Sequence, residues 1–343
     1  MIKLSIIVPV YNMAADGKLE YCINSLLNQT LKEIEIIAVD DASTDNSAEI
    51  LKQFEKDNPE KFRVILSPEN HKQGAAKNLG IKASKGEYLG FMDADDWALD
   101  VMYERLYDLA VATGADMVGC DLCHVSEHTM EVTERIPCNK AEQTGILDHE
   151  KYEKLFLDPG PLVTKIYKRE IFFEPEFEFP SDMFFEDNAT GVELYRRVKH
   201  FEYIPESMYF YLQHAGSTVH VITKERCEHR LEAMRIMVSY AKKYNYLEEF
   251  HTVLEYKFMN LFYQNTLFSY MQDDRKKDLS FIQKMGREMK ETFPDFMENP
   301  YFIKNVPEEE KKFMKLQLKS TFFFVLYYNL KKYYRRIRYG RKA

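Results

Sequence analysis

The chain has 343 residues, and 47 lysines and arginines against 55 aspartates and glutamates give it a formal net charge of −8 at pH 7. This length suits one large domain and a smaller one, and 45% hydrophobic residues can supply a sizeable core. The five cysteines are odd in number and scattered, which argues against a disulfide framework and favours reduced thiols in a cytoplasmic protein.

Strand and helix patterns alternate from residue 3 to about residue 113. Apolar, β-rich runs cover 4–12, 34–43, 63–66 and 87–92, and helical spacing follows at 19–27, from 45 onward and at 73–83. Such alternation predicts a mostly parallel sheet with helices on both faces. Because the first run starts directly after Lys3, we expect no N-terminal signal segment.

The fourth run ends in the acidic segment 93–96. In an extended chain Asp93 and Asp95 share a face, with carboxylates about 6–7 Å apart, which suits one divalent cation. The alternative is a solvated acidic turn in which Asp96 caps the next helix.

Polar residues also follow the first two runs, namely Tyr11, Asn12 and Asp41. In sheets of this kind, ligands bind beyond the carboxyl ends of the strands. There is no G-x-G-x-x-G after the first run and no G-x-x-x-x-G-K-[ST] in the chain, so backbone amides are not the obvious phosphate holder. A cation on Asp93 and Asp95, with Lys77 as a second positive charge, would neutralise a diphosphate instead.

Four motifs in order resemble the inverting family 2 glycosyltransferases of GT-A fold. They are SIIVPVYN at 5–12, VDDASTD at 39–45, GAAKNLG at 74–80 with GEY at 86–88, and DADD at 93–96. Ala42 stands where the family usually has glycine, and Lys77 where arginine is commoner. The last motif is the family's DxD element.

The resemblance implies a donor site for a UDP-sugar. Pro9, Val10 and Tyr11, with Asn12 beside them, would form a shelf under the base, where stacking on an aromatic ring is worth roughly 1–3 kcal/mol. Asp41 would accept the ring N–H of uracil. The alternatives are a core aromatic for Tyr11 and a plain turn or helix-start aspartate for Asp41.

The same resemblance places a divalent cation, Mn²⁺ or Mg²⁺, at the acidic segment. Asp93 would approach the ribose and the metal, Asp95 would ligate the metal that bridges the phosphates, and Ala94 would line the donor site between them. For Lys77 the alternative to a role at the phosphates is a solvated helix lysine.

Inverting transfer also needs a base for the acceptor hydroxyl. Phe184, Phe185, Glu186 and Asp187 resemble the family's "ED" motif, so we predict Asp187 as the base with Glu186 as its assistant, and an apolar setting would raise the carboxylate pKa. The alternative is that Asp187 caps a helix.

The segment 209–220 resembles the family's closing strand and the loop over the donor phosphates. Ser217 is a candidate donor contact there, and His220 is a candidate third metal ligand or a surface histidine. A zinc site at Cys120, Cys123 and Cys138 lacks a second properly spaced pair, so buried or free thiols are the preferred interpretation.

Helical patterns alone cover 225–244, 247–270, 275–293 and 308–338, with a loop expected at 294–307. We therefore predict a catalytic domain over 1–221, divided into a nucleotide half 1–113 and an acceptor half 114–221, and a helical domain over 222–343. After Glu310 no acidic residue follows, while eleven lysines and arginines enclose the apolar run 322–328. This tail suits contact of 311–343 with an anionic membrane surface, and the alternatives are a dimer interface or packing on its own domain.

Together with these patterns, the family resemblance implies a metal-dependent hexosyl- or N-acetylhexosaminyl-transferase. It would move a sugar from a UDP donor to a hydroxyl of a glycan or lipid-linked acceptor in bacterial cell-surface polysaccharide synthesis, at the cytoplasmic membrane face. The competing interpretations are a nucleotidyltransferase and a non-catalytic nucleotide-sugar-binding protein that assembles through the helical domain as a homo-oligomer. No motif supports nucleic-acid binding.

Overall fold

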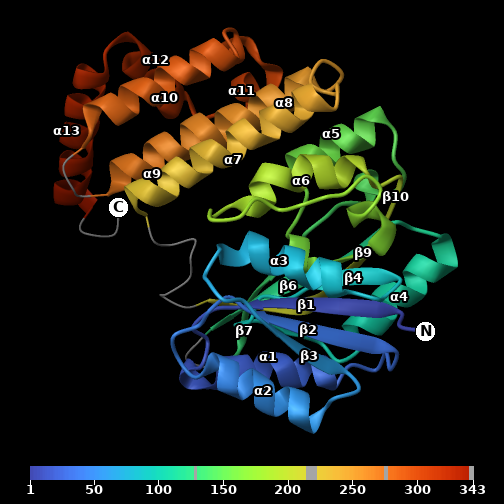
Figure 1. Cartoon of the computed structure of the whole chain (residues 1–343). Helices are drawn as coiled ribbons and strands as arrows, with labels where there is room; N and C mark the ends of the chain where they lie inside the picture. Colours follow the sequence, from blue (N-terminus) through green and yellow to red (C-terminus); the bar gives the residue numbers. More distant parts are fainter. Residues whose placement is uncertain (127–129, 214–221, 274–276, 340–343) are drawn as a thin grey trace. The chain divides into compact units, whose positions relative to one another are not determined.

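The structure is a computed structural model that describes residues 1–126, 130–213, 222–273 and 277–339. The chain forms two compact units, Met1–Thr218 and Val219–Ala343 (Figure 1). Each unit has its own core of fully buried apolar side chains, for example Ile7 and Phe91 in the first and Phe262 and Met285 in the second.

The first unit alternates strands and helices through its first hundred residues. Its strands are β1 (Leu4–Val10), β2 (Ile34–Asp40), β3 (Phe62–Leu66), β4 (Tyr88–Phe91), β5 (Trp97–Ala98), β6 (Met117–Ser126), β7 (Val132–Ile136), β8 (Gly145–Ile146), β9 (Lys165–Lys168) and β10 (His200–Gln213). Its α-helices are α1 (Lys18–Leu27), α2 (Ser47–Asp57), α3 (Lys72–Ala83), α4 (Met102–Thr113), α5 (His149–Leu157) and α6 (Glu186–Arg196).

These strands form one sheet in the order β3-β2-β1-β4-β9-β6-β10-β5, with β7 on β6 and β8 on β10. β1 pairs in parallel with both β2 and β4, and β2 pairs in parallel with β3. The predicted parallel arrangement therefore holds for β1 to β4. The second half is mixed, because β9 runs antiparallel to β4 and β6 while β10 runs parallel to β6.

Helices cover both faces of the parallel part, with α1 and α2 on one face and α3 on the other (Figure 1). Every residue of β1 is buried, which explains why its sequence is continuously apolar instead of alternating. The chain moves outward from β1 to β3 and then returns past β1 to β4. This reversal places the carboxyl ends of β1, β2 and β4 side by side, at the position where such sheets bind ligands.

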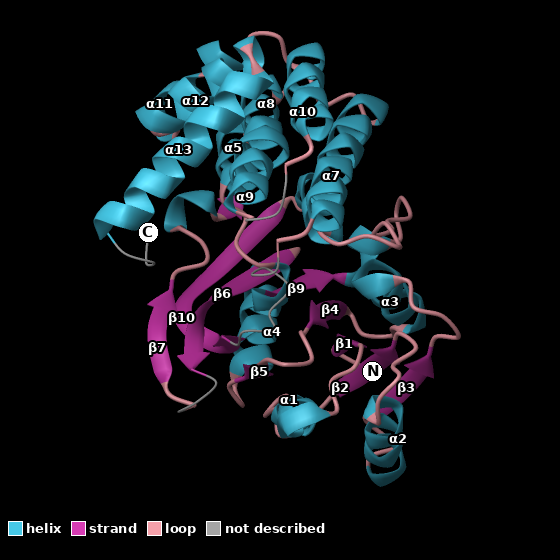
Figure 2. Cartoon of the chain, turned by 90° about the vertical axis from the view of Figure 1, so that its left-hand side faces the viewer, coloured by secondary structure: helices cyan, strands magenta, loops and turns pink. Residues whose placement is uncertain are grey.

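The described residues of the second unit form helices and their connecting loops, and every strand of the described chain belongs to the first unit (Figure 2). Its helices are α7 (Lys224–Lys243), α8 (His251–Phe258), a π-helical segment (Met259–Asn265), α9 (Thr266–Gln272), α10 (Leu279–Thr292), α11 (Pro300–Asn305), α12 (Glu308–Lys319) and α13 (Thr321–Tyr339).

Two predictions for this unit are wrong in detail. The expected loop 294–307 contains α11, whose N-terminus is capped by the Asn299 side chain. The expected single helix 308–338 is broken at Ser320, whose extended backbone separates α12 from α13. No helix among the described residues is both long enough and apolar enough to span a bilayer.

Candidate active site

The turns that follow β1 and β2 are tied together by Asn12. Its backbone N–H donates to Ser43 Oγ at 2.9 Å, and its Oδ1 accepts from the Thr44 backbone N–H at 2.7 Å. Tyr11 is 47% exposed at this position, so its ring is not a core aromatic and presents an open face at the sheet edge. Pro9 and Val10, in contrast, are buried within β1.

Asp41 is buried at the end of β2, with 3% of its surface exposed. Its backbone N–H donates to Val10 O at 2.8 Å, and its Oδ1 accepts from the His71 backbone N–H at 3.0 Å. Burial raises the pKa of Asp41, against the opposing effect of the His71 N–H. Its Oδ2 is buried without a hydrogen-bond partner in the described structure, which leaves an acceptor for a ligand N–H.

The acidic segment 93–96 forms a turn, because β4 ends at Phe91. The Asp96 backbone N–H donates to Asp93 O at 3.1 Å. The predicted strand geometry, with two carboxylates on one extended face, is therefore wrong, and it is the turn that brings these acidic residues together.

Asp96 anchors this turn to strand β10. Its Oδ2 accepts from Tyr209 Oη at 2.6 Å, and its Oδ1 accepts from the Leu212 backbone N–H at 2.8 Å, both on β10. Trp97, directly after the turn, stacks on Phe210 with ring centroids 5.7 Å apart. Asp96 is 1% exposed and lies well before α4, so the alternative of a solvated helix cap is also wrong.

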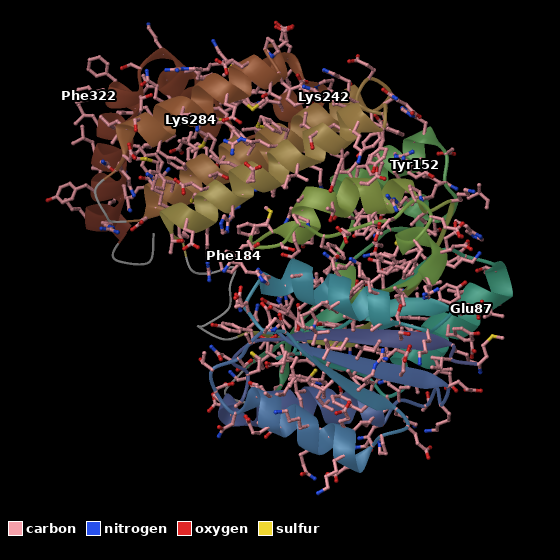
Figure 3. The ribbon with its side chains drawn as sticks, viewed as in Figure 1. Glu87, Tyr152, Phe184, Lys242, Lys284 and Phe322 are labelled. Carbon is pink, nitrogen blue, oxygen red and sulfur yellow. The ribbon has the colours of Figure 1, made fainter. Side chains whose placement is uncertain are left out.

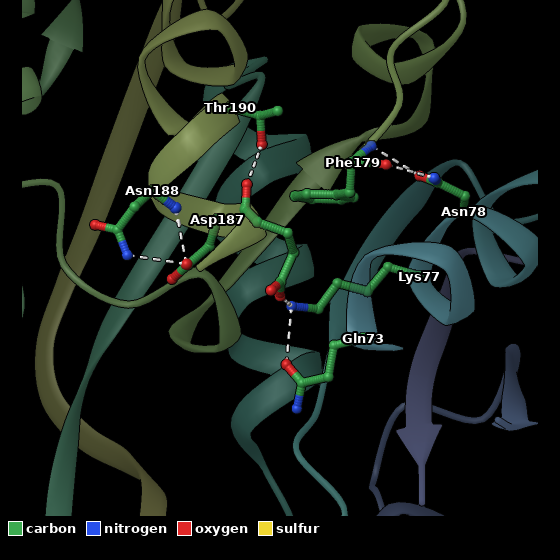
Figure 4. Close-up of polar contacts among 8 residues, drawn as sticks. Gln73, Lys77, Asn78, Phe179, Asp187, Asn188 and Thr190 are labelled. Atoms are coloured by element: carbon green, nitrogen blue, oxygen red, sulfur yellow. Dashed lines mark hydrogen bonds and ion pairs between the residues drawn. The ribbon is translucent and has the colours of Figure 1, made fainter. Parts of the chain in front are cut away.

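Lys77 of α3 is buried and pairs with Glu186 at the start of α6, with Nζ and Oε1 2.6 Å apart (Figure 4). Gln73 Oε1 accepts a second hydrogen bond from Lys77 Nζ at 3.4 Å. Burial lowers the pKa of Lys77, but the negative charges of Glu186, Asp93 and Asp187 outweigh this effect and hold it above its ordinary value. Because Lys77 is buried, it is not a solvated helix lysine.

Asp187 has an exposed side chain in the first turn of α6. Its Oδ1 accepts from the Asn188 backbone N–H at 2.7 Å and from Asn188 Nδ2 at 3.0 Å (Figure 4). Phe185 occupies the N-cap position of this helix, without a side-chain capping bond, so Asp187 is not the cap. Desolvation by the surrounding protein, together with the charge of Glu186, raises the pKa of Asp187 above its ordinary value. The charge of Lys77 and the hydrogen bonds from Asn188 oppose this rise.

Asp93 connects these groups to the acidic turn. Desolvation raises its pKa to about 6; Lys77 opposes this rise, while the charges of Asp95, Glu186 and Asp187 add to it. Four carboxylates thus influence one another around a single buried lysine. Their excess negative charge suits a divalent cation with oxygen ligands.

The described residues contain no group of three or more His, Cys, Asp or Glu side chains arranged as a ready-made metal cage. Asp93 and Asp95 would therefore supply two protein ligands, and a phosphate-bearing ligand would supply others, as is usual for Mg²⁺. Ser217 and His220, the remaining predicted contacts, lie outside the described residues. The five cysteines are buried and free.

Several contacts that shape the site carry no local sequence signal. His71 Nδ1 lies 2.8 Å from Asp182 Oδ1, and the Asn78 side chain bonds both the N–H and the carbonyl of Phe179 (Figure 4). Each pair joins α3 or its approach to the segment before α6, about a hundred residues later in the chain. Tyr209, which holds the acidic turn, lies in a segment predicted as a strand, and no local pattern marks it as a contact of Asp96.

Comparisons with known proteins show the family to which the chain belongs. A family model described as "Glycosyl transferase family 2" matches residues 5–172. "Uncharacterized glycosyltransferase EpsJ" of Bacillus subtilis is 33% identical over 235 residues, which cover 67% of this chain and 66% of that protein. "Glycosyltransferase GlyG" of Streptococcus pneumoniae serotype 4 is 31% identical over 289 residues, which cover 74% of this chain and 89% of that protein.

Among solved structures, S. aureus TarS 1–349 in complex with UDP-GlcNAc has a TM-score of 0.63 and covers 99% of this chain. The match spans 93% of the TarS chain at 17% sequence identity, so it speaks for the fold alone. This likeness confirms the predicted GT-A fold with its helical C-terminal part. From the family model and the relatives together, the chain belongs to glycosyl transferase family 2.

Proposed function

We propose that this glycosyltransferase moves a sugar from a UDP-sugar to a hydroxyl of a glycan or lipid-linked acceptor, with inversion at the anomeric carbon. The observation that carries the proposal is the buried Lys77–Glu186 pair, which lies beside Asp187 and within electrostatic reach of Asp93 in the acidic turn. One network thus holds a cation-binding element beside a carboxylate suited to accept a proton. Synthesis of bacterial surface polysaccharide at the cytoplasmic membrane face is the setting we propose.

The nucleotide would lie across the carboxyl ends of β1 and β2. The exposed ring of Tyr11 offers a stacking face for the base, and the unpartnered Oδ2 of Asp41 offers an acceptor for the ring N–H of uracil. A cytosine base has no such ring N–H, so Asp41 would favour UDP over CDP. TarS, a chain of the same fold, has been solved with UDP-GlcNAc, which supports a nucleotide-sugar donor. A hexosyl or N-acetylhexosaminyl group is the sugar that we propose.

Asp93 and Asp95 would hold Mn²⁺ or Mg²⁺ at the donor phosphates. When bound, the cation would neutralise charge on the departing diphosphate. Lys77 contributes its positive charge from a buried position and pairs with Glu186, so its role is to hold the two halves of the site together rather than to contact the phosphates.

Asp187 would take the proton of the acceptor hydroxyl. The acceptor oxygen attacks the anomeric carbon, a new C–O bond forms, and the bond between the sugar and the β-phosphate oxygen breaks with its electron pair leaving on UDP. A raised pKa makes Asp187 a better base than an ordinary aspartate. Glu186, paired with Lys77, would position Asp187.

The test is release of UDP from a panel of UDP-sugars, with Mn²⁺ or Mg²⁺ and with EDTA. We expect slow, metal-dependent hydrolysis of one donor, and its loss in both Asp95→Ala and Asp187→Asn. The matched controls are Asp100→Ala, an exposed aspartate four residues from the acidic turn, and Asp108→Asn, an exposed aspartate of α4. Turnover that persists in Asp187→Asn would refute that residue as the base.

A further inference from the structure

The outer face of α13 carries a continuous stripe of exposed apolar side chains. Its members are Phe322 (60% exposed), Phe323 (58%), Leu326 (48%), Tyr327 (53%), Leu330 (58%), Tyr333 (66%), Tyr334 (57%) and Ile337 (67%). At about 100° per residue, these positions fall within about 140° of the helix circumference. Phe322 lies on the outer side of α13 in Figure 3. We call this set the outer stripe.

The opposite face of α13 already packs on its own unit. Phe324 is fully buried, and the Tyr328 ring lies 5.2 Å from Phe313 of α12 and 6.2 Å from Phe268 of α9. Tyr327, at the edge of the outer stripe, also has its ring 5.7 Å from Phe313. Among the described residues, no other member of the stripe makes a ring contact with α9 or α12, so the stripe is not the main face that attaches this helix to its unit. Eight large apolar side chains in one exposed row form a patch of the kind that marks an interaction site.

Positive charges flank the outer stripe on both sides. On a helical projection Lys332 and Arg336 border one edge, and Arg338 borders the other. The Lys332 ammonium also donates to the Gln272 carbonyl oxygen at 2.6 Å. The inner-facing Lys331 and Arg335 pair with Glu309 of α12, at 2.7 and 2.8 Å. Beyond Glu310 the chain has no acidic residue at all, although its net charge is −8. The helix that carries the outer stripe itself has five lysines and arginines and no acidic residue.

We propose that the outer stripe inserts into the interfacial region of an anionic lipid bilayer, with the flanking lysines and arginines at the headgroups. An amphipathic helix with aromatic residues on one face and cations at its borders lies in this way in the plane of a membrane. The alternative occupant, a second copy of this chain, would bring two sets of like charges together, which opposes association. Anionic headgroups supply the opposite charge. The inference stands apart from the proposed function.

Cosedimentation of the full chain with vesicles tests the proposal. We expect binding to vesicles of phosphatidylcholine with about one third phosphatidylglycerol, and at least about ten-fold weaker binding to phosphatidylcholine alone. The variant Phe322→Ser/Leu326→Ser/Leu330→Ser should lose about ten-fold or more in affinity, because these side chains carry the insertion. Raised salt should weaken binding of the wild type.

The matched control replaces three exposed apolar residues elsewhere, Val111→Ser/Leu279→Ser/Ile303→Ser, and should bind like the wild type. Circular dichroism establishes that both variants are folded. Equal vesicle binding by the stripe variant and the wild type would overturn the proposal, and so would no binding by either. A wild-type dimer that the stripe variant dissolves, without vesicle binding, would also overturn it and assign the face to self-association.

Discussion

Asp93 bears much of the electrostatic cost of the site. Its pKa of about 6 means that the folded chain holds a proton on this carboxyl more tightly than an unfolded chain does. At neutral pH the group is ionised near Asp95, Glu186 and Asp187, with one buried lysine as the counter-charge. Such an arrangement lowers the stability of the empty site and favours a cation.

Replacement of this carboxylate should therefore stabilise the metal-free protein. Because the folded-state pKa is raised, wild-type stability falls as the pH rises from about 4 through 6, and Asp93→Asn does not share this fall. We expect Asp93→Asn to be about 1–2 kcal/mol more stable at pH 8 and to lose this advantage near pH 4.5. Urea unfolding of both proteins at the two pH values measures the difference. An equal difference at both would contradict it.

Ala42 is the other residue whose conformation predicts a cost in stability. It stands where the family usually has glycine, and its φ of 57° is in the left-handed region that disfavours a side chain. Ala42→Gly should raise the free energy of unfolding by about 0.5–1 kcal/mol. The same substitution at Ala112, an exposed residue of α4, should lower it by a similar amount. Urea unfolding measures both, and a loss of stability in both variants would refute the argument.

At the scale of elements, α3 is the bridge between the donor edge and the base. Gly74, Lys77 and Asn78 all contact the segment from Phe179 to Glu186. A Cβ at Gly74 would overlap the carbonyl oxygen of Pro180, so glycine is required for the close approach of helix and segment. Because Asp187 follows this segment directly, the packing of α3 sets the place of the proposed base.

Gly74→Ala should push the segment away from α3 and lower both stability and turnover. We expect a loss of about 2 kcal/mol or more in unfolding free energy, because the clash is with backbone rather than with a flexible side chain. Gly191→Ala on α6 is the control, since its Cβ would meet only Tyr195 Cε2 at 3.5 Å. That variant should gain up to about 1 kcal/mol. Similar losses from both substitutions would argue against the close approach.

The buried pair between α3 and α6 gives a second prediction at this scale. Lys77→Met leaves Glu186 buried without its partner, and we expect a cost of about 3–5 kcal/mol. Adding Glu186→Leu should recover most of this loss, because two apolar side chains can replace the pair. Chemical unfolding of the single and double variants decides the point. A double variant as unstable as the single one would show that the loss has another origin.

For the whole molecule, sequence reasoning reached the parallel strands and the motifs at their ends, because these signals are local. Tyr11, Asp41 and the acidic turn all lie where the alternation of strands and helices places them. The pairing of Lys77 with Glu186 and the anchoring of Asp96 by β10 join residues about a hundred positions apart. No local pattern encodes such contacts. They form only when elements distant in the chain, α3 with α6 and the acidic turn with β10, pack together.

The two units differ in how much of their structure could be predicted from the sequence. The first unit contains motifs whose residue types indicate a chemical role. In the second unit, the hydrophobic periodicity predicts helices but shows neither where they end nor what they pack against. Ser320 ends α12 through its extended backbone, a detail that a continuous helical pattern conceals. The outer stripe emerged only from the structure, because the apolar run 322–328 contains both the buried Phe324 and the exposed Phe322.

The most direct test of the account is calorimetric titration of UDP into the wild type, Asp95→Ala and Asp187→Asn, each with and without Mn²⁺. A donor site at the acidic turn predicts that Mn²⁺ strengthens UDP binding to the wild type and that Asp95→Ala loses this effect. Asp187→Asn should keep metal-dependent UDP binding while it loses turnover. UDP affinity that is absent, or that is the same in all three proteins with and without metal, would contradict the assignment.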